Sequence, residues 1–118
     1  MATTQEDFQK EVEQYQRMQQ QLQMVMMQRQ QIDLSASEVE RAQDALSKSE
    51  KAGKIYRLAG SILVPRSKED VEKELSEEAD SLKMRKDLLA KQEEKLKATL
   101  TELVKKLEAA SKLGTAGQ

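Results

Sequence analysis

The sequence predicts a mainly α-helical protein in which a long antiparallel coiled-coil hairpin carries one short β-hairpin at its turn. Two long stretches repeat apolar residues every seven positions, as a left-handed coiled coil requires. Between them lies a short segment rich in β-branched, aromatic and aliphatic residues, 55–64. The composition agrees, because 35% charged and only 3% aromatic residues are typical of long helices with a narrow apolar stripe.

The first helix is predicted over residues 5–52, where the heptad repeat is nearly continuous. One core position holds Phe8, Tyr15, Leu22, Arg29, Ala36 and Gln43, and the other holds Met18, Val25, Ile32, Val39 and Leu46. Arg29 and Gln43 interrupt the apolar stripe, and Glu11 takes what would be its first site in the second position. We expect Gly53 to end the helix, because glycine readily adopts the left-handed conformation of a helix C-cap.

A β-hairpin is predicted over residues 54–66. Ala59-Gly60-Ser61 can turn the chain between two strands of four or five residues. Pro65 lacks a backbone N–H, so we expect it to end the second strand. Apolar residues occupy both faces of this hairpin, and no further helix remains to cover them.

A lone two-stranded hairpin is marginal in water, and its edges present unpaired backbone groups. We therefore expect strands of several copies or relatives to join into an oligomeric β-barrel, which has no edges. A coiled coil with a β-hairpin at its end that only dimerises is the alternative. The residues expected to make the assembly are Ile55, Tyr56, Leu58, Gly60, Ile62, Leu63 and Val64.

The second helix is predicted over residues 67–112. Ser67 with Asp70 three residues later fits an N-cap pattern. Leucine or alanine then recurs every seven residues at Leu75, Leu82, Leu89, Leu96, Leu103 and Ala110, and the companion position holds Glu72, Ala79, Lys86, Glu93, Leu100 and Leu107. Folding the two helices together places Leu46 beside Leu75. Residues 113–118 have no periodicity and are expected to be disordered, and residues 1–118 are interpreted as one domain.

Several classes of function are excluded by residue types that the sequence lacks. With no histidine and no cysteine, the chain has no ordinary zinc site, thiol nucleophile or Ser–His–Asp triad. We expect no catalytic, cofactor-binding or metal-binding residues, and no enzyme activity. No run approaches the roughly 20 apolar residues that span a membrane. The first residues lack the features of a signal peptide, so a cytoplasmic protein is expected.

Charge gives no sign of a nucleic-acid partner, because the net charge is −1 and no dense basic stripe exists. Residues 51–67 hold four basic side chains, Lys51, Lys54, Arg57 and Arg66, and no acidic one, and we interpret them as solvated flanks of the strands. The paired carboxylates Glu77-Glu78 and Glu93-Glu94 are interpreted as helix surface without a pocket around them.

The segment Lys54-Ile-Tyr-Arg-Leu-Ala-Gly-Ser-Ile-Leu-Val64 resembles the short Y-K/R-L-x-G-x-x-L-V hairpin of beta-class prefoldin subunits. The Gln-rich first helix, including Tyr15-Gln-Arg-Met-Gln-Gln-Gln-Leu22, and the leucine repeat of the second extend the resemblance over nearly the whole chain. The connector has room for one hairpin, as in the beta class, whereas the alpha class has two. Pro65, directly after the motif, departs from the pattern.

The resemblance implies a hetero-hexamer of two alpha-type and four beta-type subunits whose hairpins form a double β-barrel. It also implies an ATP-independent chaperone, a holdase that binds unfolded polypeptides at its coiled-coil tips and delivers them to a group II chaperonin. No cofactor, nucleic acid or membrane is implied. A structural or scaffolding coiled coil without chaperone activity is the alternative, although such a protein needs no strands.

Some apolar side chains have no partner within a two-helix coiled coil: Val12, Met24, Met26, Met27, Met84, Leu88, Val104 and Leu113. Exposed apolar surface of this kind marks an interaction site, and flexible methionine suits clients of no fixed shape. Padding of an irregular seam is the alternative. The residues predicted to bind clients are Phe8, Val12, Tyr15, Met18, Leu22, Met26, Leu103, Val104, Leu107 and Leu113.

Overall fold

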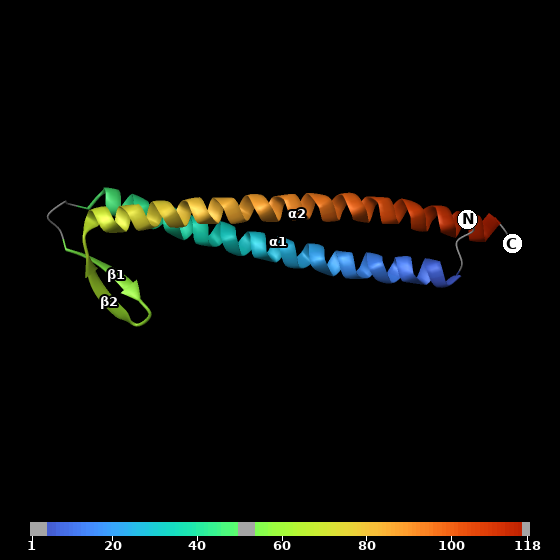
Figure 1. Cartoon of the computed structure of the whole chain (residues 1–118), viewed down its shortest axis with the longest axis horizontal. Coiled ribbons are helices and arrows are strands. Elements are labelled where there is room, and N and C mark those ends of the chain that lie inside the picture. Colours follow the sequence, from blue (N-terminus) through green and yellow to red (C-terminus); the bar gives the residue numbers. More distant parts are fainter. Residues whose placement is uncertain (1–4, 50–53, 117–118) are drawn as a thin grey trace. The chain divides into compact units, whose positions relative to one another are not determined.

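The computed structural model describes residues 5–49 and 54–116, with side chains described up to Lys112. Helix α1 spans Gln5–Ser47, strands β1 and β2 span Ile55–Ala59 and Ile62–Arg66, and helix α2 spans Lys68–Ala116 (Figure 1). Two long helices flanking one antiparallel β-hairpin confirm the predicted fold class. Gly53 and Lys51 lie outside the described residues.

Both helices end at positions that differ from the expected ones. Helix α1 ends at Ser47, before the expected residue 52. The hydroxyls of Ser47 and Ser49 donate to the carbonyls of Asp44 and Leu46, each at 2.7 Å, and so add a second hydrogen bond to carbonyls that also accept the amides of Lys48 and Ser49. Helix α2 continues to Ala116, four residues past the expected end, because one glycine near a helix end weakens the helix without stopping it.

The start of α2 is fixed by its predicted cap. The amide of Asp70 donates to Ser67 Oγ at 3.2 Å, and this bond confirms Ser67 as the N-cap residue. The ammonium of Lys68 donates to the carbonyl of Ser49 at 2.9 Å, which ties the start of α2 to the residues that follow α1.

The chain groups into two compact units, one of which is Gln30–Asp87. Here Val39 and Leu46 of α1 are buried in one cluster with Val71 and Leu75 of α2, so the helices run antiparallel and the predicted proximity of Leu46 and Leu75 is confirmed. Ile55 of β1 packs against the same cluster, together with Ala79 and Leu82. The hairpin therefore contributes a side chain to this core.

The heptad assignments of Glu72 and Lys86 were wrong, since both are exposed, whereas Val71 is buried. A straight α-helix has 3.6 residues per turn, and its buried stripe therefore drifts away from a strict seven-residue repeat. Counted back from buried Leu75 at about 100° per residue, Val71 lies about 40° away around the helix and Glu72 about 60°, so Val71 is nearer the buried stripe.

The other unit joins the described residues up to Arg29 with those from Leu88 onward. Its buried side chains include Val25 of α1 and Leu100 and Leu103 of α2, all at predicted core positions. Glu93 is also buried, 5% exposed, and its carboxylate binds Arg29 of α1. Arg29 and Glu93 therefore neutralise each other, and the interpretation of Glu93 as helix surface was wrong.

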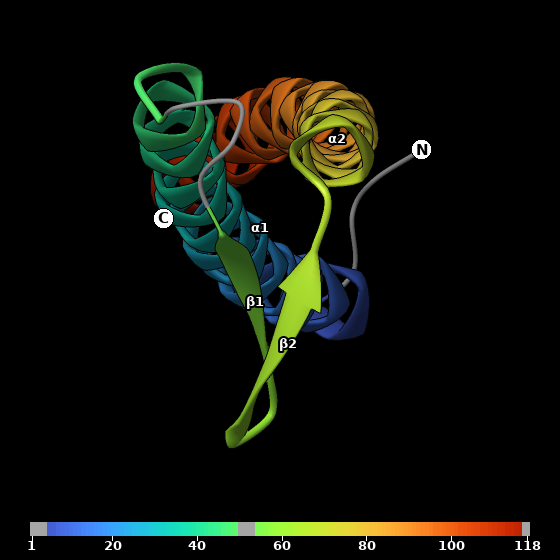
Figure 2. The same ribbon diagram turned by 90° about the vertical axis from the view of Figure 1, so that its left-hand side faces the viewer.

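Strands β1 and β2 pair in a five-residue antiparallel register from Ile55↔Arg66 to Ala59↔Ile62 (Figure 2). Gly60 has φ of 64°, the left-handed value that the first central residue of a type II′ turn requires. The expectation that Pro65 ends β2 was wrong, because Pro65 pairs with Tyr56 inside the ladder. Alternate pairs of an antiparallel ladder exchange no hydrogen bonds, and counting from the closing pair Ala59↔Ile62 places Tyr56↔Pro65 among these. The missing N–H of Pro65 costs no bond within the hairpin.

Candidate functional site

The β-hairpin has two chemically different faces. Directly paired residues of a ladder point to the same face, and successive residues point to opposite faces. One face carries Ile55, Arg57 and Arg66, all partly buried. The opposite one, here called the outer face, consists of Tyr56, Leu58, Leu63 and Pro65.

The arginine-bearing face is held to α2 by a network of ion pairs. Arg57 donates from Nη1 to Glu74 Oε2 at 2.6 Å and from Nη2 to Glu78. Arg66 binds the other oxygen of Glu74. A hydrogen bond from Arg66, reinforced by the charge of Arg66 and by Arg57, holds the pKa of the Glu74 carboxyl below its ordinary value.

This network corrects two expectations from the sequence. Arg57 and Arg66 were expected to be solvated flanks, but both are paired with α2. The same contacts show that α2 covers part of this face, at Arg57 and Arg66. The complementary charges are visible in the sequence, where the basic, acid-free middle segment is followed by the acidic start of α2, but no local pattern places the strands against that helix.

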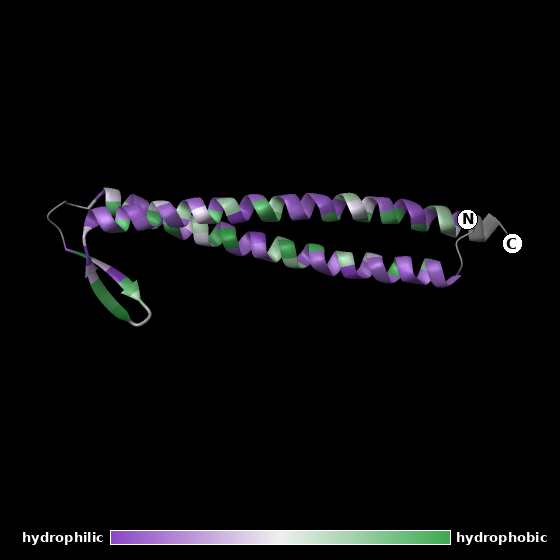
Figure 3. Cartoon of the chain, viewed as in Figure 1, coloured by the Kyte–Doolittle hydropathy of each residue, from purple (hydrophilic) through white to green (hydrophobic). Residues whose placement is uncertain are grey.

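The outer face is exposed and apolar. Tyr56, Leu58 and Leu63 are 51%, 66% and 63% exposed. Figure 3 shows β2 largely in the colour of hydrophobic residues. Ile62 and Val64, which lie beside the turn on the arginine-bearing face, are exposed as well. Since a fully buried aliphatic side chain contributes about 1.5–3 kcal/mol, covering this set has a large favourable free energy.

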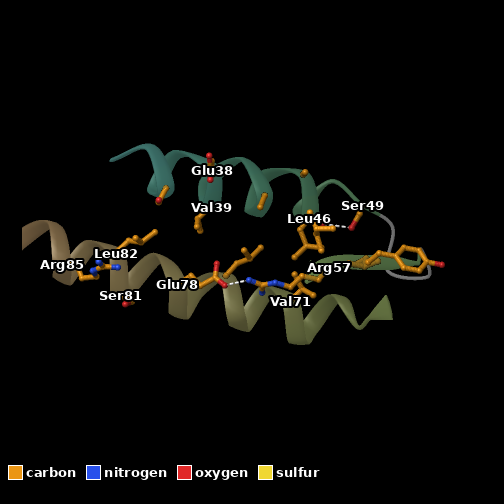
Figure 4. Close-up of a pocket in the computed structure, with 17 residues that line it drawn as sticks. Glu38, Val39, Leu46, Ser49, Arg57, Val71, Glu78, Ser81, Leu82 and Arg85 are labelled. Atoms are coloured by element: carbon orange, nitrogen blue, oxygen red, sulfur yellow. Dashed lines mark hydrogen bonds and ion pairs between the residues drawn. The ribbon is translucent and has the colours of Figure 1, made fainter. Parts of the chain in front are cut away.

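A groove of about 950 Å³ runs beside β1, between the hairpin and the two helices of its unit. Val39 and Leu46 of α1 and Val71 and Leu82 of α2 point into it (Figure 4). Glu78 lies at its wall in contact with Arg57, so the expectation that this carboxylate has no pocket around it was wrong. The lining is mostly apolar or small: Ser35, Glu38, Val39, Ala42, Ala45, Leu46, Ser49, Ile55, Tyr56, Arg57, Leu58, Val71, Leu75, Glu78, Ser81, Leu82 and Arg85.

A second exposed apolar set lies on the helices. Met24, Met26, Met27 and Leu88 belong to one unit and are exposed, as the sequence predicts. Met24 also lines a smaller groove of about 440 Å³ with Val25 and Leu96. In the unit with the hairpin, Met84 is exposed, and so is Leu34, which the sequence reasoning missed because it is a single leucine between polar neighbours.

The residues predicted to bind clients fall into different environments. Those that are half-buried are Phe8, Val12, Tyr15, Met18, Leu22, Val104 and Leu107. Met26 is exposed, whereas Leu103 is buried in the helix pair at 6% exposure. The side chain of Leu113 lies outside the described ones. A role in client binding remains a prediction for all of them.

Within residues 5–49 and 54–116, no His/Cys/Asp/Glu group is arranged to hold a metal ion. None of the described helix segments has the length and apolarity that a bilayer crossing demands.

Comparison with known proteins identifies the family. A profile described as "Prefoldin subunit" matches residues 9–112. The chain belongs to the prefoldin family. Its relatives are beta-class prefoldin subunits, including that of Methanococcus aeolicus, 48% identical over 48% of the chain and 49% of the relative. The subunit from Pyrococcus furiosus is 35% identical over 64% of the chain and 68% of its own length.

The crystal structure of the prefoldin beta subunit from Thermococcus strain KS-1 matches with a TM-score of 0.82 and 30% identity, over 93% of the chain and 96% of that structure. The chain spans about half the length of the first curated relatives it matches, 49% and 56%. Prefoldin is a family of chaperones rather than enzymes, and its beta subunits work within hetero-oligomeric complexes. The resemblance stated from the hairpin motif is therefore confirmed.

Proposed function

We propose that the chain is the beta-type subunit of a prefoldin hetero-hexamer with two alpha-type and four beta-type members. The observation that carries this proposal is the exposed apolar outer face of the hairpin, Tyr56, Leu58, Leu63 and Pro65. A two-stranded sheet with such a face and two open edges is marginal by itself. Strands of neighbouring subunits supply the missing cover.

The hexamer acts as an ATP-independent holdase in the cytoplasm, and it delivers unfolded polypeptides to a group II chaperonin. Exposed Met24, Met26 and Met27 support this activity, since flexible, polarizable side chains adapt to apolar segments of any shape. The groove beside Met24 adds a concave apolar surface. Several weak contacts of this kind, repeated over six subunits, hold a client by avidity and still release it.

A scaffolding role without chaperone activity is the competing function. It accounts for the paired helices but gives no reason for the exposed apolar outer face of the hairpin. Charged residues at Tyr56 and Ile62 discriminate the two, because they disrupt a strand-joined assembly and leave a simple coiled-coil scaffold at its original mass.

Chaperone activity is tested by mixing the chain with an alpha-type prefoldin subunit and following the aggregation of a chemically denatured client by light scattering. The double variant Met24→Gln/Met27→Gln is expected to lose most of the protection while keeping the mass of the complex. Both side chains exceed 60% exposure, so the substitution leaves the helix pair intact.

The matched control is Leu34→Gln, which removes an apolar side chain of α1 that is 52% exposed and lies outside the methionine cluster Met24, Met26 and Met27. It is expected to protect as well as the unmodified complex. Equal protection by the methionine variant would show that these methionines do not bind clients.

A further inference from the structure

The two edges of the β-hairpin offer different backbone groups to a neighbour. In an antiparallel ladder, residues of non-hydrogen-bonded pairs point their N–H and C=O groups away from the partner strand. Leu58↔Leu63 and Tyr56↔Pro65 are these pairs, given the closing pair Ala59↔Ile62.

The β1 edge presents a complete set of backbone donors and acceptors, and the β2 edge does not. Tyr56 and Leu58 each present one donor and one acceptor on the β1 edge. On the β2 edge Leu63 presents both, but Pro65 presents only its carbonyl, because proline has no N–H. A strand that pairs beside β2 therefore lacks one hydrogen bond and leaves an acceptor without its donor there.

The surroundings of the β1 edge also favour an added strand. The apolar groove of about 950 Å³ is lined along one side by residues 55–58 of β1. Its remaining lining comes from α1 and α2, including buried Leu46 and Leu75. A strand paired with β1 can place alternate side chains against these helices, so backbone bonds and apolar burial act on the same segment.

We propose that β1 is the principal docking edge of the subunit, that it takes one extended strand from a partner prefoldin subunit, and that Pro65 makes the β2 edge the weaker junction of the assembly. The inference rests on the proposed function and adds to it that the two edges of the hairpin bind their neighbours unequally. The occupant is a strand rather than a helix, because a helix has no free backbone groups with which to satisfy those of Tyr56 and Leu58.

Hydrogen exchange of the unmodified protein tests this inequality of the edges directly. Amide exchange is measured by NMR for the chain alone and for its complex with an alpha-type prefoldin subunit. The amides of Tyr56 and Leu58 are expected to slow by more than about 10-fold on assembly, and by more than the amide of Leu63, because protection follows the free energy of opening. The amides of Arg57 and Val64, bonded inside the hairpin, serve as references.

Three results can be told apart. Slowing at Tyr56 and Leu58 beyond that at Leu63 supports the proposal. A complex of the expected mass in which Leu63 is the more protected amide overturns the inequality of the edges and leaves the proposed function standing. Failure to form any complex overturns the proposed function and this inference with it.

The substitution Pro65→Val supplies the missing donor and gives a second test. It is expected to slow dissociation of the complex by about 2- to 10-fold, the range for one added hydrogen bond. Ser61→Thr, a change in the turn that alters no edge group, is the control and is expected to leave the rate unchanged. An unaltered rate for the valine variant would show that the β2 edge is not the weaker junction.

Discussion

Arg29 of α1 and Glu93 of α2 form an ion pair inside the seam of the helix pair, where the heptad pattern calls for apolar residues. Glu93 is 5% exposed, and Lys97 approaches its other oxygen at 3.1 Å. A buried charge pair of this kind adds little net stability, but removing only one partner is strongly destabilising, because the other charge is left buried without a partner. It can also fix the register of two helices, because a shifted alignment leaves a buried charge unpaired.

Replacing one member of this pair is expected to destabilise the chain. Arg29→Leu leaves the buried carboxylate of Glu93 with only Lys97, and we expect a loss of about 1–3 kcal/mol in the free energy of unfolding, measured by urea denaturation. The loss is kept at this modest size because the Arg29 side chain is 38% exposed.

The double variant Arg29→Leu/Glu93→Leu is the informative control. It completes the apolar stripe, so its stability is expected to return to within about 1 kcal/mol of the original or to exceed it. A double variant as unstable as Arg29→Leu would show that the ion pair adds net stability and does more than fix the register of the helices.

Acid is expected to loosen the hairpin from α2. Arg66 and Arg57 lower the pKa of Glu74, so the carboxylate is the form favoured in the folded chain. This contribution to stability is fully present above the ordinary pKa of 4.5 and is lost as the pH falls from there through the lowered folded value. NMR signals of the Arg57 and Arg66 side chains, recorded from pH 6 downward, report the release.

Glu74→Gln is expected to remove most of this pH dependence and to leave the hairpin loosely held at neutral pH, with Glu78 still bound to Arg57. Glu69→Gln, at an exposed carboxylate in the first turn of the same helix, is the matched control and should titrate like the unmodified chain. If both variants show the same acid transition, another group drives it.

The turn of the hairpin depends on Gly60. A β-carbon at this position meets no atom within 4 Å, so a substitution costs conformational energy rather than a steric clash. Gly60→Ala is expected to destabilise the hairpin by about 1–2 kcal/mol, the cost of φ near +60° for an ordinary residue. Faster amide exchange at Arg57 and Val64 measures the effect, and equal exchange for glycine and alanine would contradict it.

Heptad arithmetic predicted most of the helix pair because the buried positions depend on local periodicity alone. Val25, Ile32, Val39 and Leu46 are buried as expected. The arithmetic failed at Glu72, where the buried stripe of a straight helix had moved to Val71.

The contacts of the hairpin could not be predicted from local pattern. Arg57 reaches Glu74 and Glu78 only because the strands fold back along α2, and the sequence contains no periodic signal for that orientation. The place of Pro65 in the ladder depends on which pairs are hydrogen-bonded, and that alternation is set by the turn at Gly60. A rule that excludes proline from strands by composition alone does not say which positions of the ladder are hydrogen-bonded.

The account depends above all on the hairpin being completed by partner subunits. The most direct test is the molar mass, by multi-angle light scattering, of the chain mixed with an alpha-type prefoldin subunit. We predict the mass of two alpha-type and four beta-type chains, and its loss when Leu58 and Leu63 of the outer face are both changed to Glu. A chain that remains a stable monomer or simple dimer beside that partner would contradict the account.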